Sequence, residues 1–163
     1  MPLRNVSAAV EELKRTRDMG AVAAHAVTFT LPLLFGFYGV LAGGVLDRFP
    51  KLKISFLEAG ADWLPYRLQR MDHYFHSEKA IDRPGLPQRA PSEYLKDCEI
   101  YFTSEGDEKL LPEVLKGIGD DKMMILGGMP HAEARDNSIT EIEEHSDISE
   151  TQKKKFWETV RNG

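Results

Sequence analysis

The sequence predicts an α/β protein with about four parallel strands that alternate with helices. Three observations favour this class. Short apolar runs rich in β-branched and aromatic residues alternate with segments of helical pattern along the 163-residue chain. The crossovers between successive strands are long enough for right-handed β-α-β units. Two strands end in a glutamate and a third runs into a turn that holds a histidine, and parallel sheets carry their chemistry at the carboxyl ends of the strands.

The first three elements are expected to be a helix, a strand and a helix. Segment 5–20 has a serine cap, early acidic residues, late basic residues and a closing glycine, an order that complements the helix dipole. Segment 21–29, AVAAHAVTF, is interpreted as a buried strand. Segment 31–49 is interpreted as a buried helix that glycines interrupt and Pro50 closes.

The middle of the chain is expected to continue the alternation. Segment 51–60, KLKISFLEAG, predicts a strand with Glu58 at its carboxyl end. Segment 61–79 predicts an amphipathic helix with Pro65 in its first turn. The proline-rich segment 80–92 is interpreted as a surface loop.

The last third is expected to hold two more strands and three helices. CEIYFTSEGD predicts a strand tipped by Glu105, after which Asp107 caps a helix. MMIL predicts a strand that leads into two glycines and a turn with His131. Two capping boxes then predict two terminal helices, namely Ser138 with Glu141 and Ser149 with Gln152.

Composition excludes several classes of function. The formal net charge of -5 argues against a nucleic-acid partner, because phosphate binding needs a concentrated basic surface. Cys98 is the single cysteine, so an internal disulfide is excluded and a reducing compartment is favoured. The N-terminal residues show no signal-peptide pattern. These features predict a cytoplasmic protein.

One apolar stretch raises the alternative of a membrane helix. Segment 21–46 contains no Asp, Glu, Lys or Arg and is long enough to span a bilayer, and Gly39 and Gly43 have the spacing of membrane helix pairs. His25, Pro32 and the β-branched first half favour instead a buried strand followed by a packed helix. We therefore expect no membrane partner.

Three segments resemble a known family in order and spacing: GGVLDRFPKLKISFLEAGADWLPYRLQRMDHYF, PSEYLKDCEIYFTSEGDEKLLPEVL and MPHAEA. They are similar to the C-terminal half of amidohydrolase-related (amidohydrolase 2) proteins, in the branch of aminocarboxymuconate semialdehyde decarboxylase and related aromatic-acid decarboxylases and hydrolases. The resemblance covers most of the chain from about residue 26 to 162. It implies part of a (β/α)8 TIM barrel, with hydrolysis or non-oxidative decarboxylation at a divalent metal such as zinc or manganese.

The chain also departs from the family pattern. Relatives open with a His-x-His metal pair, which this sequence lacks, and Gly128 stands where they have a metal-binding aspartate. An early barrel segment is joined directly to a much later one, and 163 residues is short of the roughly 250 of a full barrel. The resemblance therefore implies a single truncated domain, 1–163, with an internal deletion. We expect no tightly bound metal, because a catalytic zinc site typically needs three protein ligands.

Three residues are candidates for the site, each with a structural alternative. Glu58 aligns with a catalytic histidine of some relatives, which implies acid/base catalysis, but a strand-end glutamate also serves as a cap or ion-pair partner. Glu105 is a second candidate, with helix capping as its alternative. His131 is the third, with a hydrogen-bonded structural role as its alternative. The other histidines lack partner spacing and are assigned to structure or surface: His25, His73, His76 and His145.

The resemblance implies a metal-dependent hydrolase or carboxy-lyase for a small aromatic or cyclic carboxylic acid, impaired or inactive in this shortened chain. The alternatives are a non-catalytic remnant and a homo-oligomeric interaction protein. The second alternative is motivated by the open sheet, because four strands cannot close a barrel and leave two edges that invite another chain. A homo-oligomer would bury those edges and the apolar segment 31–46.

Overall fold

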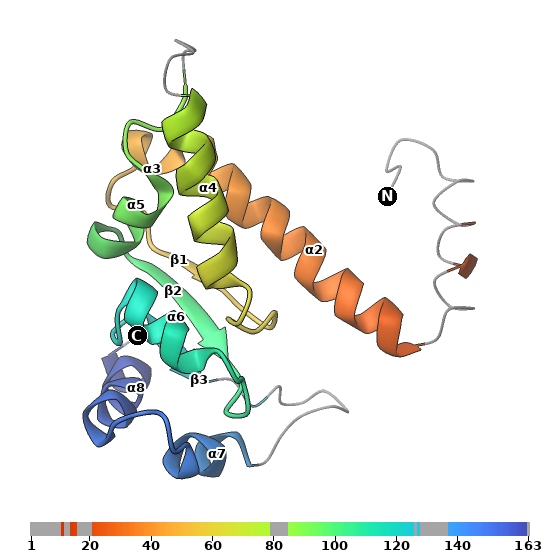
Figure 1. The fold of residues 1–163 in the computed structure, drawn as a ribbon, viewed down its shortest axis with the longest axis vertical. Coiled ribbons are helices and arrows are strands. Elements are labelled where there is room, and N and C mark those ends of the chain that lie inside the picture. The colour runs from red at the N-terminus through yellow and green to blue at the C-terminus, as the bar shows by residue number, and fades with distance from the viewer. Residues whose placement is uncertain are drawn as a thin grey trace.

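A computed structural model of the chain describes residues 11, 14, 15, 21–78, 85–125, 127 and 137–162, with the backbone alone for 21–26 and 159–162. Its three strands form a parallel sheet in the order β1-β2-β3 (Figure 1). The elements are α2 (Ala21–Ala42), α3 (Val45–Arg48), β1 (Ile54–Phe56), α4 (Leu64–Glu78), α5 (Pro91–Asp97), β2 (Ile100–Ser104), α6 (Leu111–Ile118), β3 (Met123–Ile125), α7 (Ser138–Glu144) and α8 (Glu150–Asn162).

The strand predicted over 21–29 is wrong, because these residues form the first part of α2. A continuous apolar run has no period that separates a strand from a buried helix. Alanine, the strongest helix former, occupies four of the first six positions of α2, and Pro32 does not end the helix. The described part of the sheet therefore has three strands instead of about four.

The other predicted strands are confirmed. β1 pairs with β2 through Phe56 opposite Phe102, and β2 pairs with β3 through Phe102 opposite Met123. Both pairings are parallel, as the long crossovers predict. This alternation of strands and helices is consistent with part of a barrel, and a closed eight-stranded barrel is not formed by the described residues.

Several helix boundaries differ from the predictions. The predicted loop 80–92 ends earlier, because Pro91 starts α5 and the Glu93 carboxylate accepts a hydrogen bond from the Ala90 N–H at 3.0 Å. Asn137, not Ser138, occupies the cap position of α7. The capping box of α8 is confirmed, since Ser149 and Gln152 exchange backbone-to-side-chain hydrogen bonds of 3.0 and 3.3 Å. The predicted helix over 5–20 lies almost wholly outside the described residues.

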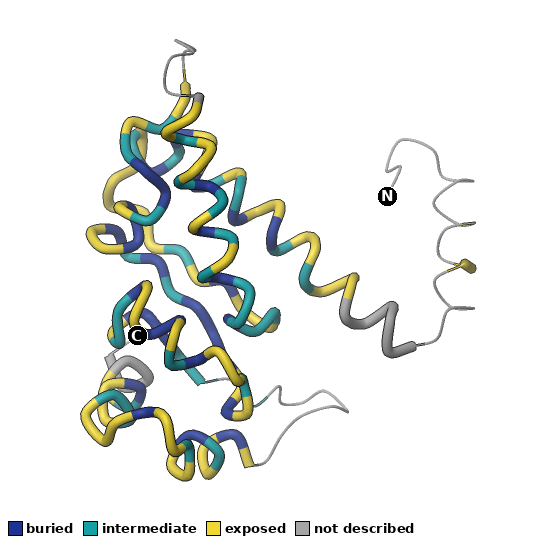
Figure 2. Tube along the Cα trace, viewed as in Figure 1, coloured by how far each residue is buried: buried dark blue, intermediate teal, exposed yellow. Residues whose placement is uncertain are grey.

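Aromatic rings from three elements meet at the centre of the core. The ring of Phe37 in α2 lies 5.4 Å from Phe56, 5.0 Å from Trp63 and 6.0 Å from Phe102, centroid to centroid. Phe56 and Phe102 stack on neighbouring strands at 5.5 Å. Figure 2 shows the buried residues concentrated along β2. The cluster thus joins α2 to the sheet, and the helices α4, α5 and α6 contact one another.

No helix among the described residues is both long and apolar enough to cross a membrane.

Candidate functional site

Two of the predicted site residues lie just beyond the carboxyl ends of the neighbouring strands β1 and β2. Glu58 lies two residues after β1 and Glu105 directly follows β2, and the two parallel strands are neighbours. The Glu58 N–H donates to Thr103 Oγ1 at 3.0 Å, which ties the end of β1 to β2. Both glutamates are exposed. The structure thus places them on adjoining loops, and a catalytic role for either stays a prediction.

Glu58 has an unusual backbone conformation. Its φ is +63°, and it is the one non-glycine residue with positive φ among the described parts of the chain. A side chain in the left-handed region costs about 1–2 kcal/mol per residue. Such strain persists where the surroundings enforce it, and it is concentrated at active sites and ligand-binding loops. The strained residue here is the one that the family resemblance selects as the acid/base candidate.

The structure does not describe all of the other residues singled out from the sequence. His131 and Gly128 lie outside the described residues, as does the side chain of His25. His73 and His76 are exposed on α4, and His145 follows α7. The described residues contain no group of three or more His, Cys, Asp or Glu that would hold a metal ion. The absence of a tightly bound metal stays a prediction.

Sequence reasoning missed Glu108, whose carboxylate joins the two strand-end loops. Glu108 Oε2 accepts hydrogen bonds from the N–H groups of Ala61 at 2.6 Å and Asp62 at 2.8 Å, both in the loop after β1. Its Oε1 accepts from the Glu105 N–H at 2.7 Å, in the loop after β2. No local pattern predicts that Glu108 joins the two loops, because Ala61 and Asp62 lie 47 and 46 positions away in the sequence.

The predicted cap Asp107 is also replaced by a tertiary partner. α6 begins at Leu111, later than expected, and Leu110 is in the cap position without a side-chain bond of its own. The Leu110 N–H instead donates to Asp62 Oδ1 at 3.0 Å. A side chain from the loop after β1 therefore serves the start of α6.

Burial raises the pKa of Glu108 to about 7, and the nearby negative charge of Asp62 adds to this, while the three backbone N–H donors act in the opposite direction. A carboxyl group with such a pKa would suit general acid/base catalysis near neutral pH. However, both of its oxygens are engaged by backbone N–H groups. Its geometry therefore indicates a role in holding the loops.

This pKa predicts a pH dependence of stability. The folded protein binds the Glu108 proton up to about pH 7, whereas the unfolded chain releases it near 4.5, so this group's contribution falls as pH rises through that window. Relative to Glu108→Gln, the wild-type free energy of unfolding should decrease by up to about 3 kcal/mol between pH 4.5 and 7 and then stay level. Urea unfolding of both proteins at several pH values measures this difference. A difference that rises with pH would contradict the assignment.

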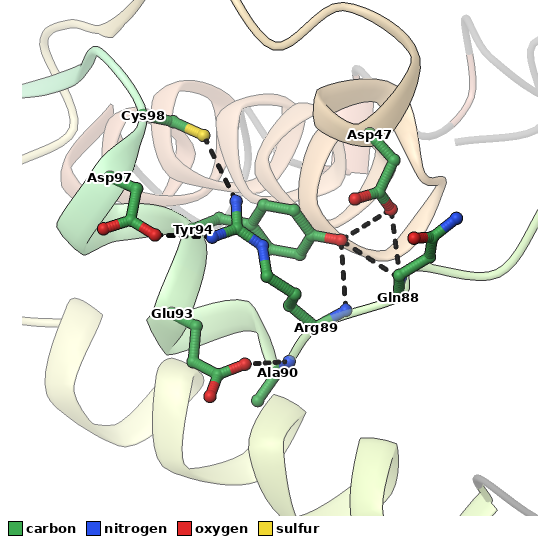
Figure 3. Close-up of polar contacts among 8 residues, drawn as sticks. All are labelled: Asp47, Gln88, Arg89, Ala90, Glu93, Tyr94, Asp97 and Cys98. Atoms are coloured by element: carbon green, nitrogen blue, oxygen red, sulfur yellow. Dashed lines mark hydrogen bonds and ion pairs between the residues drawn. The ribbon is translucent and has the colours of Figure 1, made fainter.

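A second polar network joins Asp47 to residues of the segment that precedes β2 (Figure 3). The buried Tyr94 hydroxyl donates to Asp47 Oδ2 at 2.6 Å and accepts from the backbone N–H groups of Gln88 and Arg89 at 3.1 and 3.3 Å. The Arg89 guanidinium lies 4.5 Å from the Tyr94 ring centroid and also contacts Asp97 and the sulfur of Cys98, two residues before β2. Its position and its mutually satisfied groups indicate a structural role.

We expect Tyr94→Phe to lower the free energy of unfolding by about 1–3 kcal/mol, because the Arg89 N–H loses its acceptor and Asp47 loses a donor. Tyr74→Phe is the matched control, since the Tyr74 side chain is 53% exposed and accepts a hydrogen bond from Arg70. That control should change stability by less than about 0.5 kcal/mol. Chemical denaturation measures both, and equal effects would contradict the structural role.

Comparison with known proteins tests the fold that the sequence resemblance implies. No protein-family model matches the chain. Among solved structures, it superposes on an amidohydrolase from Mycobacterium avium subsp. paratuberculosis K-10 with a TM-score of 0.62 and 22% identity, over 82% of this chain and 30% of that chain. The chain has an amidohydrolase-related fold. The fold that the sequence resemblance implies is thereby confirmed.

Two further amidohydrolase-related structures are decarboxylases solved with manganese. Dihydroxybenzoic acid decarboxylase from Polaromonas sp. JS666, with the inhibitor 2-nitroresorcinol, has a TM-score of 0.61 and 25% identity over 78% of this chain and 38% of its own. A mutant 5-carboxyvanillate decarboxylase from Novosphingobium aromaticivorans DSM 12444 was solved with 3-methoxy-4-hydroxy-5-nitrobenzoic acid. It has a TM-score of 0.58 and 20% identity, over 76% of this chain and 36% of its own. The chain thus spans about a third of the length of the solved structures it matches.

Proposed function

We propose that this amidohydrolase-related chain contributes to non-oxidative decarboxylation, or to hydrolysis, of a small aromatic carboxylic acid. The observation that carries the proposal is the strained Glu58 at the carboxyl end of β1, where the family resemblance expects an acid/base group. Support comes from the matched decarboxylases, which were solved with nitro-substituted aromatic compounds. The substrate class is carried over from those proteins.

The proposed step assigns one task to Glu58. In non-oxidative decarboxylation the bond between the ring carbon and the carboxylate carbon breaks, carbon dioxide leaves, and the electron pair stays on the ring carbon. That carbon then takes a proton from a positioned acid, for which we propose the Glu58 carboxyl group, and water restores the proton to Glu58. Glu105 on the adjoining loop would orient the substrate through hydrogen bonds to its ring hydroxyl groups.

The metal of the matched decarboxylases does not fit the described residues of this chain. They supply no cluster of three donors, so no step is assigned to a metal here. We propose that the chain alone binds manganese or zinc weakly and turns over substrate slowly. Elemental analysis after dialysis against either metal tests the first part. One equivalent retained by the chain would contradict it.

The alternative roles of the chain stay predictions. β1 and β3 are the outer strands of the described sheet, and an open edge can pair with another chain. A homo-oligomer would therefore bury sheet edges, and a stable monomer at micromolar concentration in sedimentation velocity would argue against it. A cytoplasmic location likewise stays a prediction.

Release of labelled carbon dioxide tests the proposed function. Carboxyl-labelled dihydroxybenzoic acids and 5-carboxyvanillate would be incubated with the chain and manganese, with heat-unfolded chain as the control for metal-catalysed background. The proposal predicts slow release above that background, abolished by 2-nitroresorcinol. Release no faster than with unfolded chain for every acid, together with no hydrolysis of their amide or lactone analogues, would contradict it.

A further inference from the structure

The two strand-end loops exchange side chains in a reciprocal arrangement. The loop after β1 contributes the Asp62 carboxylate to the Leu110 N–H, at the start of α6. The loop after β2 contributes the Glu108 carboxylate to the N–H groups of Ala61 and Asp62, just before α4. Each loop therefore supplies an acceptor to backbone N–H groups that lie just before the helix following the other loop.

Glu108 differs from Asp62 because it also binds its own loop. Its second oxygen accepts from the Glu105 N–H at 2.7 Å, so one carboxylate spans both loops. The Glu108 carboxyl group also lies against Gly60 of the partner loop, which has a φ of +61° and where an added Cβ would lie 3.3 Å from that group. A side chain at position 60 would thus be strained and crowd the carboxylate.

The loop after β2 is held from another side as well. An added Cβ at Gly106 would lie 2.4 Å from the Cβ of Glu141 and 2.8 Å from the carbonyl oxygen of Ser138, so α7 lies directly against this loop. Glu105 precedes this contact by one residue and follows β2 directly. Its backbone is therefore confined between the strand, α7 and the Glu108 carboxylate.

We infer that Glu108 is a positioning residue whose carboxylate, together with Asp62, clasps the loop carrying Glu58 to the loop carrying Glu105. The consequence for catalysis rests on the proposed function, whereas the clasp itself does not. The charged side chain that acts on Glu108 from the α4 side is Asp62, and on its own loop Glu105 contributes a backbone N–H. A change in the protonation of Glu108 should therefore shift the amide signals of both loops.

Amide chemical shifts of the ¹⁵N-labelled full chain between pH 5 and 9 test the clasp. In the wild type, the amides of Ala61, Asp62 and Glu105 should titrate with one shared midpoint near pH 7. Glu108→Gln should abolish this shared titration, while Glu113→Gln, an exposed carboxylate on α6, should leave it unchanged. Separate midpoints in the wild type, or a shared midpoint that survives in Glu108→Gln, would overturn the inference.

A second variant keeps the test decisive if Glu108→Gln does not fold. Asp62→Asn retains an acceptor for the Leu110 N–H but removes the negative charge that adds to the effect of burial on the Glu108 pKa. The shared midpoint should then move to lower pH in all three amides by the same amount. A midpoint that moves in one loop alone, or that differs between the loops, would overturn the inference.

A kinetic arm tests the consequence for catalysis. In a chain that releases carbon dioxide, Glu108→Gln should lower kcat by up to about 100-fold with KM unchanged, because misplaced reacting groups cost rate more than binding. Shared amide titration with unchanged kcat in the variant would overturn the positioning role. Failure of the amide test in a chain that is active would overturn the clasp and leave the proposed function standing.

Discussion

Replacing Phe37 by alanine is expected to lower the free energy of unfolding by about 3–5 kcal/mol. The Phe37 side chain is fully buried, and its ring contacts Phe56, Trp63 and Phe102. The change removes a large apolar side chain from water-free surroundings and leaves a cavity between α2 and the sheet. Urea unfolding followed by tryptophan fluorescence measures the loss, and Trp63 lies next to the cavity.

The matched control for this change lies two residues away on the same helix. Phe35 is 72% exposed, so Phe35→Ala should alter the free energy of unfolding by less than about 0.5 kcal/mol. Similar losses in both variants would contradict the placement of α2. They would show that Phe37 does not join the helix to the aromatic cluster.

Glu58→Gln is expected to lower kcat for decarboxylation by about 10²–10⁴-fold, the usual contribution of general acid/base catalysis. Glutamine keeps the size of the side chain and the strained backbone but cannot transfer a proton. KM should change little, because the proposed role of Glu58 lies in the transition state and not in binding. Release of labelled carbon dioxide at saturating substrate measures kcat, and an unchanged rate would exclude Glu58.

Glu58→Gly separates the strain from the chemistry. Glycine adopts positive φ readily, so this variant should raise the free energy of unfolding by about 1 kcal/mol while it removes activity. A gain in stability together with a loss of activity is the pattern expected when strain is kept for function. A loss of stability would mean that the Glu58 side chain mainly supports the fold.

Three of the four predicted strands were confirmed, because each has a clear local signal. The runs around Ile54, Ile100 and Met123 are short, rich in β-branched or large apolar residues and separated by helical segments. Their parallel pairing then follows from the length of the crossovers. The positions of Glu58 and Glu105 at one edge follow in turn, because neighbouring parallel strands end on the same side of a sheet.

The failures share a physical cause, which is that tertiary structure overrode or replaced local patterns. Segment 21–29 is apolar except for His25 and Thr28, and besides its alanine content it continues into the well-packed half of α2 around Phe37. The Ala61 N–H, shortly before α4, donates to Glu108 in the loop after β2. The Leu110 N–H, at the cap of α6, donates to Asp62 in the loop after β1. Acceptors more than 40 positions away leave no capping motif in the sequence. The ends of the strands that carry Glu58 and Glu105 were predictable, and the structure shows the hydrogen bonds that hold the two loops together.

Chemical-shift mapping of 2-nitroresorcinol binding tests most directly whether the carboxyl ends of β1 and β2 form the site. The titration uses the ¹⁵N-labelled chain, with zinc present as a diamagnetic divalent ion. If the site lies there, the amide shifts should be concentrated in residues 57–62 and 104–108, the two loops after β1 and β2. The structural network around Tyr94, at the other end of β2, should be unaffected. Shifts centred on that network, or no shifts at millimolar ligand, would contradict the placement of the site at the two loops.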